Sequence, residues 1–194
     1  SGQVGKDLAP GYPFYNAGMK GLKGSNDEGG ARVPFFVRWP GKIEAGREID
    51  LIASHIDVLP TLAALTGAIL PEGQVEGRNL LPLIEGKAEG WEDRYIFNHV
   101  CRWPTGANPE DFREVNFSVR NQKFRYVGAR AGGGGGKGKA KKGAPAAPAG
   151  PELYDMEADP GQTKNVIADH PDIAAKMKAA YDQYWTEAVS LMVN

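Results

Sequence analysis

The segment at residues 21–32 has the composition of an anion-binding loop. Its sequence, GLKGSNDEGGAR, contains four glycines, which permit close backbone approach and can turn backbone N–H groups toward an anion. Lys23 lies within it as a compact cation with three donors, which suits a tetrahedral anion such as sulfate or phosphate. The segment is not a P-loop, because Gly24 rather than Ser or Thr follows the lysine and no predicted strand precedes it. Composition alone leaves open a glycine-rich surface loop with a solvated lysine.

The elements that follow this segment would hold it in place. Residues 33–39 (VPFFVRW) have the β-branched and aromatic character of a strand. A helix is then expected over 57–66, because Asp57 as N-cap leaves Pro60 in the first turn, where its missing N–H is harmless. Gly67 is the expected C-cap residue. The helix would present one apolar face, formed by Val58, Leu62 and Leu65.

The second half of the chain predicts a small sheet covered by a helix. Three segments have strand character: 94–100, 114–120 and 123–127. The short link between the last two predicts an antiparallel hairpin, and residues 152–155 (ELYD) form a candidate edge strand. Residues 171–189 fit an amphipathic helix whose apolar stripe comprises Ile173, Met177, Ala180, Tyr181, Tyr184 and Ala188. A helix packed on an antiparallel sheet buries one face of each.

Composition narrows the classes of partner. The 194 residues carry a formal net charge of −1, which excludes a globally basic nucleic-acid binder. No apolar stretch reaches the roughly 18–20 residues of a membrane span. We therefore expect neither nucleic acid nor a membrane as a partner. The single cysteine, Cys101, excludes an intramolecular disulfide and a Cys-rich zinc site.

The amino-acid composition of residues 131–151 differs from that of the rest of the chain. The sequence AGGGGGKGKAKKGAPAAPAGP consists of Gly, Ala, Lys and Pro, so it has too little apolar surface to offset the entropy of ordering. We expect a flexible, solvated connection, although its four lysines would also suit an anionic polymer.

Four sequence motifs resemble those of one family, in the same order along the chain. Residues 23–34 (KGSNDEGGARVP) match the sulfatase signature K-G-[ST]-x-x-E-G-G-x-R-x-P, and WPG follows at 39–41. The further matches are DVLPT at 57–61 with LTG at 65–67, GRNLL at 77–81, and ELYD at 152–155 with Asp159-Pro160 and Asn165. The chain thus resembles the C-terminal part of a sulfatase of the alkaline-phosphatase-like superfamily.

The resemblance implies one catalytic residue, Lys23, which in the family binds the sulfate and the bridging ester oxygen. Glu28 and Arg32 match the same motif, and we interpret them as supports for the loop that could form an ion pair with each other. In sulfatases the C-terminal subdomain can reach the mouth of the pocket. His99, Arg102 and Trp103 are therefore candidates for substrate contact, although a histidine beside a strand end is more commonly a structural hydrogen-bonding residue.

Other parts of the family's machinery are not visible in these residues. The nucleophile is a formylglycine made within C-x-[PA]-S-R, a motif that the sequence does not contain, and Cys101 lies in a different context. The complete enzyme would use calcium, but no calcium ligand is identified in this chain. The missing N-terminal part of the catalytic domain is therefore an expected partner, and the chain alone is expected to be inactive.

The predicted fold class is α/β: a C-terminal fragment of an alkaline-phosphatase-like sulfatase fold, with a small antiparallel sheet packed by a C-terminal helix. Residues 1–90 would be the end of the catalytic domain, and 91–194 a small subdomain carrying the 131–151 insertion. The expected reaction is hydrolysis of a sulfated small molecule or carbohydrate, and the family resemblance favours a periplasmic or secreted parent protein. Two alternatives stay open: a phosphonate or phosphodiester hydrolase of the same superfamily, and a non-catalytic module that binds carbohydrate or a partner.

Overall fold

The computed structural model describes residues 15–73, 75–100, 103–130 and 150–192, so Cys101, Arg102 and most of the 131–151 insertion lie outside the described residues. Contacts divide the chain into two compact units. We call them the sheet unit, Ser1–Val33 with Tyr95–Asn194, and the helix unit, Pro34–Arg94. The expected division at residue 90 grouped the lysine segment with the helix at 57–66. The contacts group it instead with the C-terminal strands, because its acidic side chains pair with arginines there.

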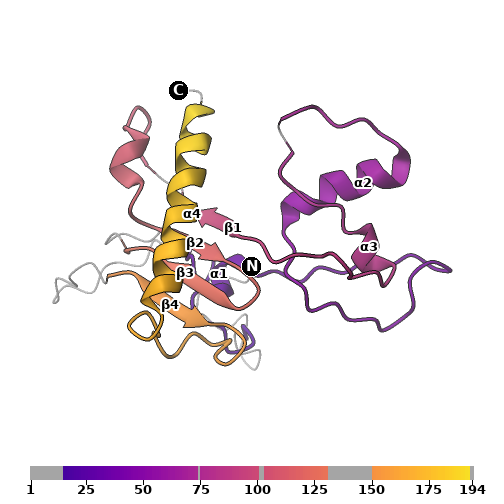
Figure 1. Ribbon diagram of the computed structural model, residues 1–194, viewed down its shortest axis with the longest axis horizontal. Helices are drawn as coiled ribbons and strands as arrows, with labels where there is room; N and C mark the ends of the chain where they lie inside the picture. Colours follow the sequence, from indigo (N-terminus) through magenta and orange to yellow (C-terminus); the bar gives the residue numbers. More distant parts are fainter. Residues whose placement is uncertain (1–14, 74, 101–102, 131–149, 193–194) are drawn as a thin grey trace, which may run out of the picture. The chain divides into compact units, whose positions relative to one another are not determined.

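The sheet unit contains a four-stranded antiparallel sheet with the strands in sequence order, β1-β2-β3-β4 (Figure 1). The strands are β1 (Ile96–His99), β2 (Phe117–Arg120), β3 (Phe124–Val127) and β4 (Glu152–Asp155). The predicted hairpin between β2 and β3 is confirmed, and Asn121 closes it by accepting a hydrogen bond from the Phe124 N–H at 2.6 Å. β4 is the predicted edge strand. A 3-10 turn (Pro109–Phe112) lies between β1 and β2.

The helix α4 (Pro171–Ser190) packs against β2 and β3 (Figure 1). It matches the helix predicted at 171–189, and Pro171 lies in its first turn, where a proline is tolerated. Met177 and Tyr181 of the predicted stripe are fully buried. Ala174 and Trp185 complete the buried face, whereas Ile173 and Tyr184 flank it. The Tyr181 ring stacks on Phe117 of β2 with centroids 3.6 Å apart, so α4 and the sheet share one aromatic core.

The helix unit contains α2 (Val58–Thr66), preceded by a 3-10 turn (His55–Asp57), and the short α3 (Leu81–Ile84). Gly67 ends α2 with φ of 71°, as predicted for a C-cap glycine. Asp57 is the N-cap residue of α2, as predicted, but its side chain makes no cap hydrogen bond to that helix. It accepts hydrogen bonds from the backbone N–H groups of Ser54 and Arg78 and from the Arg94 guanidinium. Asp57 is fully buried and joins three segments of this unit.

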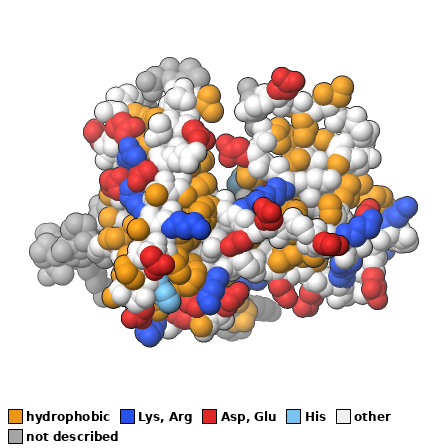
Figure 2. All heavy atoms as spheres, in the orientation of Figure 1, with side chains coloured by type: hydrophobic (Ala, Val, Ile, Leu, Met, Phe, Trp, Pro, Cys, Tyr) orange, Lys and Arg blue, Asp and Glu red, His pale blue; other side chains and the backbone are white. Residues whose placement is uncertain are grey.

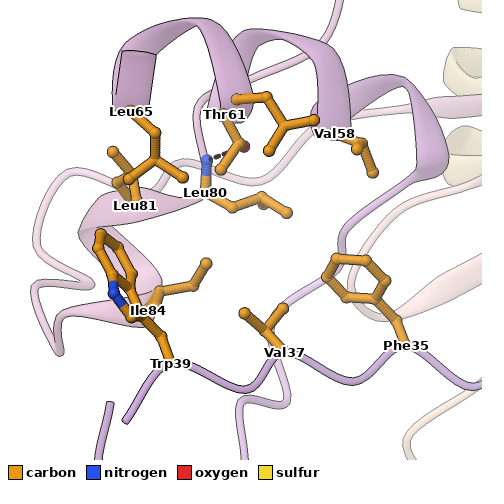
Figure 3. Close-up of a pocket in the computed structure, with 10 residues that line it drawn as sticks. Phe35, Val37, Trp39, Val58, Thr61, Leu65, Leu80, Leu81 and Ile84 are labelled. Atoms are coloured by element: carbon orange, nitrogen blue, oxygen red, sulfur yellow. Dashed lines mark hydrogen bonds between the residues drawn. The ribbon is translucent and has the colours of Figure 1, made fainter. Parts of the chain in front are cut away.

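The expected strand at residues 33–39 is absent from the described structure. A strand needs a neighbour for its backbone groups, and no described segment pairs with this one. Phe35, Val37 and Trp39 nevertheless alternate in sequence and line one apolar pocket together with α2 and α3 (Figure 3). The predicted apolar face of α2 lines the same pocket but stays partly exposed, with Leu62 at 52%.

None of the helices in the described part of the chain is long and apolar enough to cross a membrane.

Candidate anion-binding site

The glycines of the lysine loop, which we define as residues 20–32, are required by close backbone packing. The loop runs into the short helix α1 (Glu28–Ala31), and the Gly29 N–H donates to the Lys20 carbonyl at 2.8 Å. A Cβ on Gly29 would lie 2.5 Å from the Gly21 oxygen, and one on Gly30 would lie 2.3 Å from the Ser25 oxygen. Neither position has room for a side chain. The loop is thus a compact fold rather than a flexible glycine-rich stretch.

Lys23 lies in a tight turn within this loop. The Ser25 N–H donates to the Leu22 carbonyl at 2.9 Å, and the Ser25 hydroxyl accepts from the Leu22 N–H at 3.2 Å. Gly24 has φ of 89°, a left-handed conformation that glycine adopts without strain at the third position of a turn. Lys23 is exposed, and no ion pair to it is recorded among the described residues. Its ammonium group therefore projects from a backbone that is fixed on both sides.

Glu28 is buried beneath the loop and is paired with Arg125 of β3. The Arg125 Nη2 and Nε groups donate to one Glu28 oxygen at 2.6 and 3.2 Å. Arg125 also donates to the Asn26 carbonyl at 3.0 Å and to the Ser118 hydroxyl at 3.1 Å. A buried carboxylate is costly unless it is paired and hydrogen-bonded. Arg125, with Arg120 Nε a further 3.7 Å from the same oxygen, compensates the Glu28 charge inside the unit.

Asp27 is held by a second arginine, Arg130. The two Nη groups of Arg130 donate to the two Asp27 carboxylate oxygens, each at 2.8 Å, and Nη2 also donates to Glu152 of β4 at 2.8 Å. Burial opposes ionisation of Asp27, but the hydrogen bonds and charge of Arg130 outweigh it and hold the pKa below its usual value. The pKa of Glu152 is also lowered, because burial, which raises it, is outweighed by the hydrogen bond from Arg130 and by other nearby partners. Both carboxylates are therefore charged at neutral pH.

Gln162 and Lys20 complete the attachment of the loop to the sheet unit. The buried Gln162 accepts the Glu28 N–H at 2.7 Å. Lys20 donates to the Tyr154 hydroxyl and lies 3.5 Å from Glu152. Burial and the nearby Glu152 carboxylate raise the pKa of Tyr154, which keeps its hydroxyl protonated. Lys20 thus faces the sheet, whereas the exposed Lys23 has no such anchor.

Arg32 contributes less to the support of Glu28 than the sequence motif implied. The predicted Glu28–Arg32 pair is present at 3.8 Å, but the Arg32 side chain is 66% exposed. The sequence analysis did not identify Arg125 and Arg130 as partners of the loop. Two successive acidic residues, if buried, require cationic partners, so the need for such partners could have been inferred. The sequence does not show which of the 23 lysines and arginines supply them.

His99 and Trp103 lie together in the aromatic cluster against α4. A ring nitrogen of His99 is 3.1 Å from the Phe112 carbonyl, and its ring packs against Trp103 and Trp185. Burial lowers the pKa of His99, although hydrogen bonds to the backbone of Phe112 and Val115 oppose this. These contacts explain both side chains as part of the core. Substrate contact by His99 and Trp103 stays a prediction, and Arg102 lies outside the described residues.

The described residues do not fit a calcium site. No group of three or more His, Cys, Asp or Glu side chains in the described ranges could hold a metal. The carboxylates nearest Lys23 in sequence, Asp27 and Glu28, are directed at arginines. We therefore derive no catalytic step through calcium from these residues.

Comparisons with known proteins identify relatives of this chain. A family model described as N-sulphoglucosamine sulphohydrolase, C-terminal, matches residues 25–128. Human steryl-sulfatase is 47% identical over 87 residues, which cover 44% of this chain and 15% of that protein. Human arylsulfatase A is 35% identical over 150 residues, which cover 75% of this chain and 28% of that protein. The chain thus spans less than a third of the length of these relatives.

Solved structures agree with these matches. A sulfatase structure described with the metabolism of multiple glycosaminoglycans by Bacteroides thetaiotaomicron has a TM-score of 0.58 at 26% identity, and the match covers 87% of this chain and 32% of that one. The structure of Ps i-CgsB has a TM-score of 0.62 at 22% identity, covering 90% of this chain and 33% of the other, and supports the fold alone.

Proposed function

Because this chain belongs to the sulfatase family and corresponds to its C-terminal part, we propose that it supplies the sulfate-binding lysine, Lys23, for the hydrolysis of a sulfate ester. The observation that carries the proposal is the contrast within the lysine loop. The buried carboxylates of Asp27 and Glu28 form ion pairs with arginines, whereas Lys23 is exposed on a hydrogen-bonded turn. That arrangement leaves the Lys23 ammonium group available to an incoming anion.

The chemical role of Lys23 follows from its charge. Hydrolysis transfers the sulfuryl group from the ester oxygen ultimately to water, giving an alcohol or phenol and inorganic sulfate. Negative charge develops on the bridging oxygen as the S–O bond breaks. An ammonium group fixed near that oxygen stabilises the charge in the transition state without having to reorganise. The three N–H donors of Lys23 can contact sulfate oxygens at the same time.

The nucleophile and the metal site belong, in this proposal, to polypeptide outside these 194 residues. The formylglycine motif does not occur in the sequence, and the described residues offer no metal-ligand cluster. The apolar pocket of the helix unit supports the same view. Its volume is about 100 Å³, and two of its lining side chains, Phe35 and Leu62, are 58% and 52% exposed. We propose that the remainder of the catalytic domain covers this face (Figure 3).

A sulfated carbohydrate is one substrate class that the similar structures suggest. The Bacteroides thetaiotaomicron structure is described with glycosaminoglycan metabolism and resembles this chain over 87% of its length. Bovine arylsulfatase A, at 33% identity, also matches 87% of this chain and 33% of its own length, so the extent of the match does not separate a sugar sulfate from an aryl sulfate. We therefore propose a sulfated sugar as the first substrate to test and an aryl sulfate as the reporter of activity.

The test is the Lys23→Ala substitution in the complete sulfatase that contains this sequence. We expect kcat for an aryl sulfate to fall by about 10²–10³, the loss typical of removing one group that stabilises developing negative charge. Lys23→Arg keeps the charge but changes its shape, and we expect it to recover part of the rate. Wild-type kcat in the alanine variant would favour the non-catalytic binding module. Calcium-dependent turnover of an aryl sulfate by the 194 residues alone would contradict the proposed division of the site.

A further inference from the structure

The turn that carries Lys23 is attached to the sheet unit through the three residues after Ser25. Arg125 holds the Asn26 carbonyl at 3.0 Å and the Glu28 carboxylate at 2.6 Å. Arg130 holds the Asp27 carboxylate through two hydrogen bonds of 2.8 Å. The two arginines therefore fix consecutive residues that directly continue the Lys23 turn. We call this pair the arginine clamp.

The clamp also settles the charge balance beneath the loop. Asp27, Glu28 and Glu152 are three carboxylates close to the same surface, and each has at least one cationic partner among Lys20, Arg125 and Arg130. Without the clamp, a sulfate approaching Lys23 would meet uncompensated carboxylates a few residues away. With it, and with Arg120 and Arg32 also 3.7 and 3.8 Å from Glu28, each of these carboxylates faces a cation other than Lys23.

We propose that Arg125 and Arg130 are positioning residues for Lys23, which set the direction of its ammonium group and shield the sulfate from Asp27 and Glu28. This inference rests on the proposed function of Lys23. Neither arginine needs to touch the substrate, since both act through the backbone and side chains of residues 26–28. Both lie on or just after β3, so the small C-terminal sheet is the part of the molecule that orients the lysine.

Arg130→Gln in the complete sulfatase is the main test. Arg130 is 34% exposed, so the variant leaves the aromatic core in place. We expect kcat for an aryl sulfate to fall about 10- to 100-fold, because a displacement of about 1 Å at a catalytic group is enough for losses of this size. Arg130→Lys, which keeps a cation, should restore part of the rate. Limited trypsin digestion without substrate should cut faster after Lys23 in Arg130→Gln than in the wild type.

Arg113→Gln is the matched control. Arg113 belongs to the same unit, its side chain is 31% exposed, and it pairs with Asp182 of α4 at 2.9 Å, so it resembles Arg130 in type, exposure and contact. It has no recorded contact with the lysine loop. We expect kcat within about twofold of the wild type and unchanged cleavage after Lys23. Arg125→Lys serves as a second clamp variant, because it keeps the charge beside Glu28 but loses the forked contacts.

The double variant Lys23→Ala with Arg130→Gln separates positioning from an independent effect. If Arg130 acts through Lys23, the double variant has the kcat of Lys23→Ala alone, within about twofold. A further loss equal to that of Arg130→Gln in the wild type would overturn the inference. So would wild-type kcat and wild-type trypsin protection in both clamp variants while Lys23→Ala is inactive. An active Lys23→Ala variant would instead contradict the proposed function itself.

Discussion

The sheet unit and the helix unit differ in how they use their apolar side chains. In the sheet unit α4 and the sheet enclose a shared core, in which Met177 and Tyr181 have no exposed surface. In the helix unit the apolar side chains of residues 34–39 and those of Leu59, Leu62 and Leu65 in α2 remain at the surface, with Phe36 at 91% exposed. Figure 2 shows hydrophobic side chains on the surface of the helix unit. The sheet unit thus has the features of a finished small fold, and the helix unit those of one layer of a larger one.

The largest expected effect that tests this contrast is on the core of the sheet unit. Trp185→Ala removes a side chain that is 1% exposed, together with its hydrogen bond to Glu110 at 2.9 Å. We expect the free energy of unfolding of the sheet unit to fall by about 3–5 kcal/mol. Hydrogen exchange, followed separately in the two units, measures the loss. A uniform loss of protection in both units would show that they fold as one and would break the contrast.

A smaller effect on stability is expected in the helix unit, and it depends on whether the rest of the sulfatase is present. Leu62 lines the apolar pocket but is 52% exposed, so Leu62→Asn in the 194-residue chain should change stability by less than about 0.5 kcal/mol. In the complete sulfatase, where we propose that the pocket is covered, the same substitution should cost about 2 kcal/mol. Urea denaturation of both forms gives the two values. Equal small costs would mean that the pocket stays open in the complete protein.

The smallest expected effect is the pH dependence of the sheet unit. Burial lowers the pKa of His99 from its ordinary 6.5, so below that pH the unfolded chain binds more protons than the folded one. The stability that neutral His99 provides is therefore present above about pH 6.5 and is lost as the pH falls through the folded-state pKa. Urea denaturation between pH 7.5 and 5 should show this decline.

Two controls define the origin of that pH dependence. His99→Gln, which has no titrating ring, should flatten the decline. The carboxyl groups of Asp27 and Asp182, whose pKa values lie below the usual 3.8, lose their contribution only near pH 4 and below, outside the window. An unchanged slope in His99→Gln would assign the decline to other groups.

The features that the sequence predicted are those encoded over short distances. The periodicity of residues 171–189 located α4, and Asn121 with Gln122 located the hairpin, because both signals arise between near neighbours. The Glu28–Arg32 pair was found for the same reason, since four residues separate its members. The catalytic interpretation of Lys23 came from the family motif and not from any local pattern.

The features that it missed depend on partners far along the chain. Arg125 is 97 residues from Glu28, and Arg94 is 37 residues from Asp57. Asp57 is at the predicted N-cap position of α2, but its carboxylate pairs with Arg94, a partner that no local pattern identifies. Residues 33–39 have strand composition, but no described segment pairs with them, and composition cannot supply a neighbour.

The contact between Arg130 and Glu152 has a consequence for how the protein tolerates variation. The Arg130 Nη2 group lies 2.8 Å from the Glu152 carboxylate, and Val127 of β3 pairs with Glu152 of β4, so the described ends of this connection lie on neighbouring strands. For a connection that is flexible, as the composition of residues 131–151 predicts, doubling the length costs only about 0.6 kcal/mol. We therefore expect an affinity tag inserted there to leave the register of β3 and β4 unchanged.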